Sequence, residues 1–194
     1  SFSITSVGFS KKIIPRNNAK LGDDIYVTGN LGDSFIGLQI LKNKIHVSKK
    51  IKNYFITKYY QPDIQINLSK KLFKFANTSI DISDGLIADL EKMINKQNLS
   101  YTLYENFIPI SKHLKRLIKD KKLSKIRHVS NGDDYQILFT ASSSKARIIH
   151  NVSKKLDIQI TKIGKINSGI KQSIVLNQKG EQLLIKNKGY THQF

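Results

Sequence analysis

The feature that most constrains the fold is a joint at which a short apolar run with β-like alternation leads directly into a helical pattern. The clearest joint is TSIDISDGLI at 78–87, where isoleucines two residues apart are followed by apolar residues at helical spacing. The stretch DDIYVTGNLGDSFIGLQIL at 23–41 has the same order. Strands and helices that alternate in this way, and end in β-rich sequence, predict an α/β (α+β) domain with helices packed on a mixed sheet.

The same patterns predict the other elements of the chain. Strands are expected at 1–9, 22–30, 78–82, 100–105, 133–142, 157–166, 173–177 and 181–187. Helices are expected at 31–43, 47–60, 68–76, 84–97, 110–120 and 143–155. Pro62 supports the end of the second helix, because the residue before a proline avoids helical geometry.

The chain is strongly basic, with 33 Lys and Arg against 14 Asp and Glu and a formal net charge of +19. Such a charge fits an anionic partner such as a nucleic acid or a nucleotide. The basic residues are spread along the chain without an arginine-rich arm, which favours a general lysine enrichment of the surface. Carboxylates that cluster in so acid-poor a chain are therefore candidates for a specific role.

Several classes of site are excluded or disfavoured. The chain has no cysteine, which excludes disulfides, thiol catalysis and cysteine-ligated metals and is compatible with a cytoplasmic protein. No apolar run approaches the ~18 residues that would cross a membrane. The histidines form no metal-spaced pair and no evident Ser-His-Asp set, so we expect them mostly at the surface; they are His46, His113, His128, His150 and His192.

The joint at 78–87 has the chemistry of a metal–nucleotide site. A helix start presents backbone N–H groups and partial positive charge, both of which favour phosphate. Asp81 and Asp84 offer the hard oxygen atoms that Mg²⁺ accepts alongside substrate phosphates, and Ser83 adds a hydroxyl. A plain helix cap by Ser83 or Asp84 explains the same residues. The residues alone leave both interpretations open.

Two other acidic stretches and the C-terminal aromatic have alternatives of the same kind. SNGDDYQILF at 130–139 places Asp133 and Asp134 before a strand, where an ordinary Asn-Gly-Asp turn is favoured over a ligand contact. NLGDSFIGL at 30–38 lacks the Lys-Ser/Thr ending of a phosphate loop, so a tight turn with Asp33 or Ser34 as helix cap is favoured. Tyr190 in KGYTHQF either stacks on a planar ligand or packs on the core.

Taken in order, five segments resemble the C-terminal portion of the thiamine-monophosphate kinase family: AKLGDDIYVTGNLGDSFIGLQIL, FANTSIDISDGLIADL, SNGDDYQILFT, IGKI and KGYTHQF. The resemblance covers nearly the whole chain and implies the C-terminal domain of the aminoimidazole-ribonucleotide-synthetase-like fold. It implies that 1–18 are remnant strands of a missing N-terminal ATP-binding domain and that 19–194 form the C-terminal α/β domain. The single methionine, Met93, agrees with a fragment, because no initiator is present.

The resemblance also implies an activity and its residues. The family transfers the γ-phosphoryl group of ATP to thiamine monophosphate, giving thiamine diphosphate, as a cytoplasmic Mg²⁺-dependent homodimer. The roles it implies are metal binding for Asp81 and Asp84, ATP binding for Arg16 and Ser83, and substrate binding for Asp133 and Tyr190. We assign no catalytic general base, because phosphoryl transfer depends on positioning and charge neutralisation.

Two residues depart from the family pattern. Asp133 stands where the family has a glutamate, and Gln65 stands where an arginine is usual. The shorter Asp133 side chain is expected to weaken or redirect a substrate contact. With the N-terminal domain missing, we expect the 194-residue chain alone to be inactive or nearly so.

The alternatives are another ATP-using enzyme of the same superfamily, against which KGYTHQF argues, and a non-enzymatic basic RNA-binding domain, which rests only on the charge. Neither a nucleic-acid partner nor a membrane partner is favoured.

Overall fold

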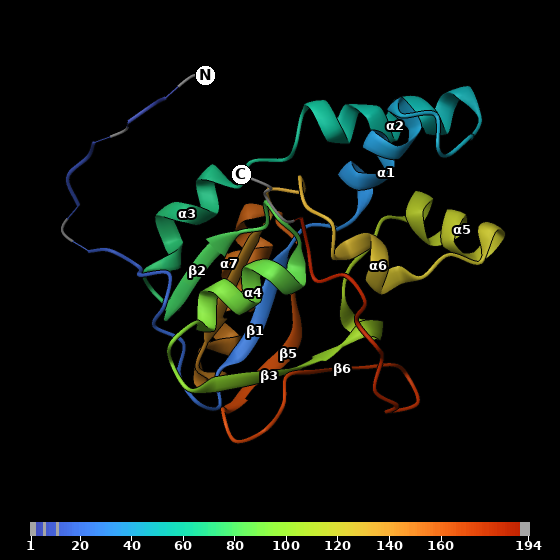
Figure 1. Cartoon of the computed structure of the whole chain (residues 1–194). Coiled ribbons are helices and arrows are strands. Elements are labelled where there is room, and N and C mark those ends of the chain that lie inside the picture. Colours follow the sequence, from blue (N-terminus) through green and yellow to red (C-terminus); the bar gives the residue numbers. More distant parts are fainter. Residues whose placement is uncertain (1–2, 6, 11, 191–194) are drawn as a thin grey trace.

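The computed structural model describes residues 3–5, 7–10 and 12–190 (Figure 1). The strands among them form one sheet in the order β2-β4-β1-β5-β3-β6. Their bounds are β1 (Asp24–Thr28), β2 (Thr78–Asp81), β3 (Leu99–Tyr104), β4 (Ile137–Ala141), β5 (Ile160–Ser168) and β6 (Ile174–Leu176). All neighbours are antiparallel except β3 and β6, which are parallel. The predicted mixed sheet is therefore confirmed.

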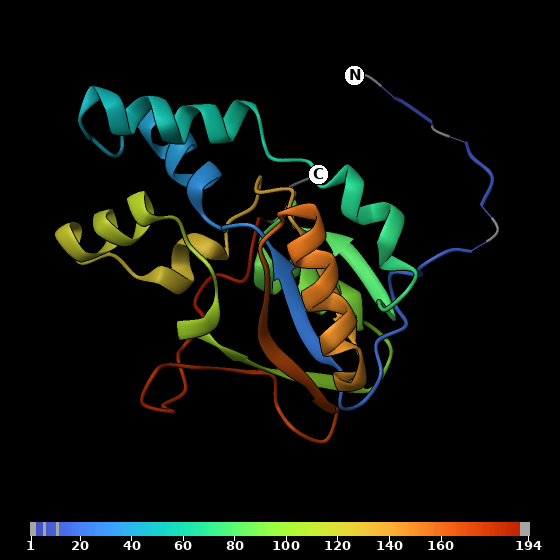
Figure 2. The same ribbon diagram turned by 180° about the vertical axis from the view of Figure 1, so that it is seen from behind.

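Helices cover both faces of this sheet, and Figures 1 and 2 show the two sides. The α-helices are α1 (Asp33–Leu41), α2 (Lys49–Tyr60), α3 (Ile66–Leu72), α4 (Leu86–Ile94), α5 (Lys112–Lys121), α6 (Lys125–Val129) and α7 (Ala146–Leu156). Short 3₁₀ turns, η1 (Glu105–Phe107) and η2 (Ser143–Lys145), follow β3 and precede α7. The α4 helix lies on one face, and α3 and α7 lie on the other.

Alternation along the strands explains the two layers. Ile25 and Val27 of β1 belong to the same buried cluster as α4, whose apolar stripe includes Leu86 and Leu90. Tyr26 points to the other face, where its ring stacks on Phe139 of β4 at 5.2 Å between centroids, within the cluster that α3 and α7 complete. Each face of the sheet thus has its own core.

A separate helical lobe stands beside the sheet. The α1, α2 and α5 helices bury Ile36, Ile40, Phe55, Leu114 and Leu117 against one another. Figure 1 shows these helices beyond the end of the sheet at which β1 leads into α1. Within the described residues, no helix combines the length and apolar character that membrane crossing requires.

Two predicted strands are absent. The described residues within 1–9 form no strand, and Figure 1 shows this arm leading away from the sheet, with no strand beside it to complete a ladder; residues 1–2 and 6 lie outside the described residues. In the arm, Ile4, Val7 and Phe9 are exposed. The predicted strand at 181–187 is reduced to one isolated bridge between Leu176 and Gln182.

The prediction was also wrong about the start of one strand, and it did not include one short helix. β4 begins at Ile137 and not at 133, because Asp133 and Tyr135 have left-handed backbone (φ 69° and 50°) that interrupts an extended strand. The α6 helix at Lys125–Val129 was not predicted, since five residues are too few for a recognisable helical period. The division at residues 18 and 19 remains a prediction.

Candidate functional site

Two loops that are distant in sequence meet at one end of the sheet. Because β2 and β4 are neighbours, their ladder continues into the loops. The backbone N–H of Asp133 donates to the Ser83 carbonyl, and that of Tyr135 donates to the Ile82 carbonyl, each at 2.9 Å. Ile82 N–H donates in turn to the Gln136 carbonyl at 2.9 Å. The structure therefore joins the predicted sites at 81–84 and 133–134 into one site.

Glycines allow this close approach. A Cβ atom on Gly132 would lie 1.7 Å from the Ser83 carbonyl oxygen. A Cβ atom on Gly85 would lie 2.2 Å from the Ser130 carbonyl oxygen, and Gly85 also has a φ of 121°. The two loops can thus pack backbone to backbone only because both positions lack side chains.

The backbone N–H groups at the start of α4 are hydrogen-bonded to a carboxylate of the same helix. The fully buried Asp89 accepts, at Oδ2, the backbone N–H groups of Ser83, Asp84 and Gly85 at 3.0, 2.9 and 3.1 Å. The helix cap residue is Gly85, and no side chain at that position caps the helix. The interpretation of Ser83 or Asp84 as the helix cap was therefore wrong, because Gly85 is the cap residue and Asp89 accepts these N–H groups. The metal–nucleotide interpretation remains a prediction.

The carboxylate of Asp84 remains at the surface of the joint, half-buried and in contact with Lys92 Nζ. Asp81 is exposed at the end of β2, and Asp133 is half-buried. Burial and, second, the charge of Asp84 raise the pKa of Asp133, whereas the Lys42 charge opposes that rise. The carboxyl groups therefore share one negatively charged region, which suits a cationic ligand.

Tyr135 is a residue of this region that sequence reasoning missed. Its side chain is 39% exposed although both chain neighbours, Asp134 and Gln136, are buried. Burial raises the pKa of Tyr135, and the charges of Asp133 and Asp81 raise it further. A left-handed backbone at a bulky residue is a signal of a special site, but the sequence does not carry it.

The C-terminal segment closes the site from a third direction. Tyr190 N–H donates to the Asp84 carbonyl, and Ala88 N–H donates to the Lys188 carbonyl, both at 2.8 Å. Tyr190 is 64% exposed, so of the two alternatives left open for it, packing on the core was wrong. A polar groove of about 360 Å³ runs between α4 and this segment, and its lining includes Lys92, Lys188 and Tyr190.

Arg16 lies away from this cluster. Thr78 Oγ1 donates to the Pro15 and Arg16 carbonyls at 2.8 and 2.6 Å, which fixes the Arg16 backbone beside the first residue of β2. Asp81 is the last residue of that strand, about 10 Å away at the usual rise of a strand. The Arg16 side chain is exposed, and the structure does not bring it to the carboxylates.

The predicted turn at 30–38 has a structural role. Gly32, with a φ of 86°, begins α1, and its N–H donates to Asp134 Oδ2 at 2.8 Å. Asp33 is buried and accepts hydrogen bonds from Ser111 Oγ at 2.7 Å and Tyr54 Oη at 2.8 Å. The expected cap by Asp33 or Ser34 was therefore wrong, because the buried Asp134 occupies that place.

The remaining candidate side chains contribute less to the site. His128 is buried, contrary to expectation, with Nδ1 2.6 Å from the Ser124 carbonyl, and His192 lies outside the described residues. Gln65 is half-buried, with its side-chain amide 3.4 Å from Gln136 Oε1.

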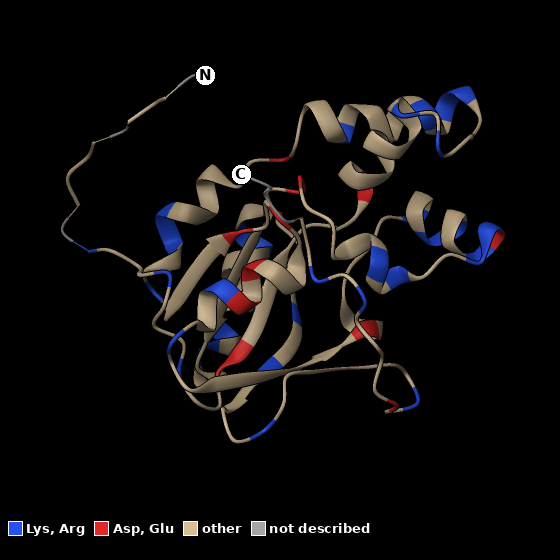
Figure 3. Cartoon of the chain, in the orientation of Figure 1, with Lys and Arg blue, Asp and Glu red and all other residues tan. Residues whose placement is uncertain are grey.

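The basic residues do not collect at one place. Figure 3 shows Lys and Arg on several helices and loops around the sheet, including α2, α3, α5 and α6. Such a distribution fits general surface enrichment better than a single nucleic-acid interface.

Among the described residues there is no group of three or more His, Cys, Asp or Glu side chains placed to hold a metal by themselves. Asp81 and Asp84 nevertheless fit Mg²⁺, which is commonly held by one or two carboxylates together with substrate phosphates. Both residues offer carboxylate oxygen atoms at the solvent-facing end of the sheet, where a Mg²⁺ ion could also be reached by substrate phosphates.

Known proteins with sequences similar to this chain are thiamine-monophosphate kinases. The protein named so in Buchnera aphidicola from Acyrthosiphon pisum is 36% identical over 99% of this chain and 60% of its own length. The Escherichia coli K12 protein is 31% identical over 93% of this chain and 55% of its own. The chain thus spans little more than half the length of these relatives. No family model matches the chain.

Solved structures agree. A thiamine-monophosphate kinase from Stenotrophomonas maltophilia matches 88% of this chain and 54% of its own, with a TM-score of 0.73 and 29% identity. A structure of AaThiL complexed with AMPPCP and TMP matches 92% of this chain and 53% of its own, with a TM-score of 0.73 and 28% identity. Hydrogenase maturation protein HypE, at 13% identity and a TM-score of 0.62, shares the fold alone. The predicted resemblance and fold class are confirmed.

Proposed function

We propose, on the premise that the chain is similar to thiamine-monophosphate kinases over nearly its whole length, that it forms part of an ATP-dependent kinase. The reaction is transfer of the γ-phosphoryl group of ATP to thiamine monophosphate, giving thiamine diphosphate. The observation that carries the proposal is the meeting of loops 82–85 and 130–136 with the C-terminal segment at one cluster of carboxylates. A relative of similar fold is described in complex with AMPPCP and TMP, which supports a nucleotide and a phosphorylated co-substrate.

In this proposal, Asp81 and Asp84 hold Mg²⁺ and Ser83 contacts the nucleotide. When bound, the metal neutralises phosphate charge, which is the main requirement of phosphoryl transfer. The chain's own contribution is position: the hydrogen bonds that the Ser83 and Asp84 N–H groups donate to Asp89 fix the backbone at these two residues. Contact of the nucleotide with Arg16 requires it to extend along β2, from the Asp81 end toward Thr78.

Asp133 and Tyr190 are the proposed contacts of the second substrate. Both approach the joint through backbone hydrogen bonds, Asp133 to Ser83 and Tyr190 to Asp84. The phosphates of the two substrates repel each other, and they also repel the carboxylates of the site, unless cations lie between them. The Mg²⁺ requirement therefore follows from the charges of the partners.

The active protein is proposed to be a cytoplasmic homodimer in which further parts complete the site. The described residues present two candidate metal carboxylates, with Arg16 far from them. Phosphoryl transfer needs several cationic groups around the transferred phosphate. The 194-residue chain alone is therefore proposed to be inactive or nearly so.

The test is a chromatographic assay of thiamine diphosphate formed from ATP and thiamine monophosphate, using the full natural polypeptide that contains this chain. Product formation that requires Mg²⁺ supports the proposal. A full natural polypeptide that is folded but makes no thiamine diphosphate would contradict it. The isolated 194-residue chain, assayed in parallel, is expected to give no more than background, and robust turnover would overturn the incomplete-site proposal.

A further inference from the structure

Lys92 joins two carboxylates that have different surroundings. Its Nζ contacts Asp84 Oδ2 and lies 2.7 Å from Asp89 Oδ1. The Asp89 side chain is 0% exposed, whereas that of Asp84 is 16% exposed and that of Lys92 is 40% exposed. A buried carboxylate requires a countercharge, so Asp89 keeps the ammonium group beside Asp84.

Asp89 does not depend on Lys92 alone. Its second oxygen, Oδ2, accepts the N–H groups of Ser83, Asp84 and Gly85, and this arrangement holds the loop in place. The Lys92 ammonium can therefore leave Asp84 without loss of the loop geometry. A lysine ammonium carries three donors on a flexible chain, which allows it to give up one carboxylate and keep the other.

We propose that Lys92 is an internal competitor for the divalent cation at Asp84. Its ammonium balances the Asp84 carboxylate when no metal is bound, and it withdraws to Asp89 when a metal binds. An ammonium and a divalent cation on the same carboxylate oxygen repel each other, so one must yield. Lys92 thereby lowers the metal affinity of the site. The inference rests on the proposed function, because it takes Asp84 as a metal ligand.

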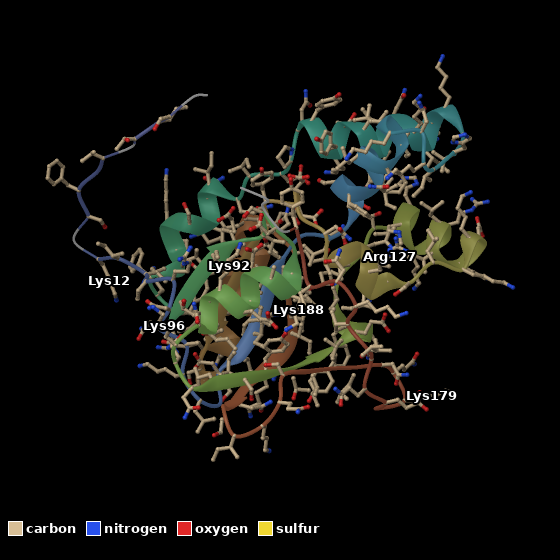
Figure 4. All side chains as sticks on the ribbon, viewed as in Figure 1. Lys12, Lys92, Lys96, Arg127, Lys179 and Lys188 are labelled. Atoms are coloured by element: carbon tan, nitrogen blue, oxygen red, sulfur yellow. The ribbon has the colours of Figure 1, made fainter. Side chains whose placement is uncertain are left out.

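Lys188 provides a matched control in the same groove. Its Nζ lies 2.8 Å from Glu91 Oε1, so this lysine also pairs with a carboxylate of α4. Both lysines line the groove beside Tyr190, and Figure 4 labels both near α4. Removal of Lys188 changes the net charge equally but leaves the Lys92–Asp84 contact intact.

The experiment measures Mn²⁺ binding to the full natural polypeptide, without nucleotide, from the electron paramagnetic resonance signal of free Mn²⁺. The variants are Asp84→Asn, Lys92→Met and Lys188→Met, and each lysine variant is also combined with Asp84→Asn. The sites that Asp84→Asn removes define the Asp84-dependent binding. Lys92→Met is expected to tighten this binding about fivefold, the upper range for loss of one partly exposed ion pair. Lys188→Met is expected to change it by less than about twofold.

Lys92→Gln covers the case in which Lys92→Met fails to fold, because the amide still donates to the buried Asp89. It is expected to tighten the binding in the same direction. Unchanged or weaker Mn²⁺ binding in a folded Lys92 variant, with the Asp84-dependent site present, overturns the inference and leaves the proposed function standing. Mn²⁺ binding that Asp84→Asn does not alter overturns the inference and the proposed metal role of Asp84, since Asp84 is then no ligand, whereas the kinase assay alone decides the proposed activity.

Discussion

The starts of α1 and α4 are built alike. Each follows a strand of the same sheet, each begins at a glycine with positive φ, Gly32 at 86° and Gly85 at 121°, and neither uses a side chain at the cap position. At each start, a buried aspartate accepts backbone N–H hydrogen bonds: Asp134, from the loop before β4, at α1, and Asp89, from the first turn of the helix itself, at α4. The two helix starts thus share one way of satisfying their unpaired donors.

The two helix starts differ in how accessible the carboxylate next to the glycine is. Beside Gly32, Asp33 is 4% exposed and bonded to Tyr54 and Ser111 inside the helical lobe. Beside Gly85, Asp84 reaches the surface, where the opposing loop brings Asp133. A glycine at a strand-to-helix joint is therefore not enough to indicate phosphate binding. The proposed site differs from the α1 start because an acidic side chain stays accessible beside backbone N–H groups that are already hydrogen-bonded.

The largest expected effect tests the buried aspartates that accept the backbone N–H groups at the two helix starts. Asp89→Ala removes the acceptor of three N–H groups and the buried partner of Lys92, and should lower the free energy of unfolding by about 3–5 kcal/mol. Urea denaturation followed by circular dichroism measures it. Asp134→Ala, at the other helix start, should also destabilise the fold, by about 1–3 kcal/mol for its unsatisfied donors. A loss below about 1 kcal/mol for Asp89→Ala would show that this aspartate does not hold the joint.

The second effect tests the contact between the loops. Gly132→Ala places a Cβ atom 1.7 Å from the Ser83 carbonyl, so the loops must separate at a cost of about 1–3 kcal/mol. Substrate turnover should fall with it, because Asp133 moves away from Asp84. Gly8→Ala is the control, since nothing lies within 4 Å of a Cβ there, and it should stay within about 0.5 kcal/mol of wild type. Equal stability of the two variants would contradict the backbone contact.

The sequence predicts the strand-to-helix joints but not the contacts that separate the two helix starts. The strand-to-helix joints were predictable because alternation and helical spacing are local properties. The pairing of Ser83 with Asp133 depends on β2 and β4 being neighbours, which is a matter of topology. The role of Asp89 was hidden, because an aspartate in the first turn of a helix looks like an ordinary response to the helix dipole.

Resemblance supplied what local patterns could not. It groups Asp81, Ser83 and Asp84 with Asp133 and Tyr190, and the structure places these residues around one joint. It also grouped Arg16 with them, and the structure leaves Arg16 at the far end of β2. Tyr135, in contrast, has no distinctive sequence signal, since only its backbone conformation sets it apart.

A further expected effect concerns pH at the start of α1. Burial raises the pKa of Asp134 well above its usual value, so the folded protein holds a proton that the unfolded chain releases above about pH 4. The contribution of this proton to stability is complete below about pH 4 and is lost as the pH rises toward the folded-state pKa. Asp134→Asn does not titrate, so its stability relative to wild type should increase over this pH range, by about 1.4 kcal/mol for each pH unit between the unfolded-state and folded-state pKa values.

Urea unfolding of both proteins between pH 4 and 8 measures this difference. A relative stability that falls with rising pH would show that Asp134 is held as the carboxylate, and the two helix starts would then be alike in charge as well.

The most direct test of the central claim is calorimetric binding of AMPPCP, with Mg²⁺ and thiamine monophosphate, to the full natural polypeptide carrying Asp84→Asn or Asp33→Asn. Asp84→Asn is expected to bind at least tenfold more weakly, about 1.4 kcal/mol, because Asp84 is the proposed metal ligand. Asp33→Asn should bind within about twofold of wild type, because Asp33 is enclosed by Tyr54 and Ser111. The reverse order, or equal losses from both variants, would contradict the assignment of the α4 start as the site and the α1 start as structural support.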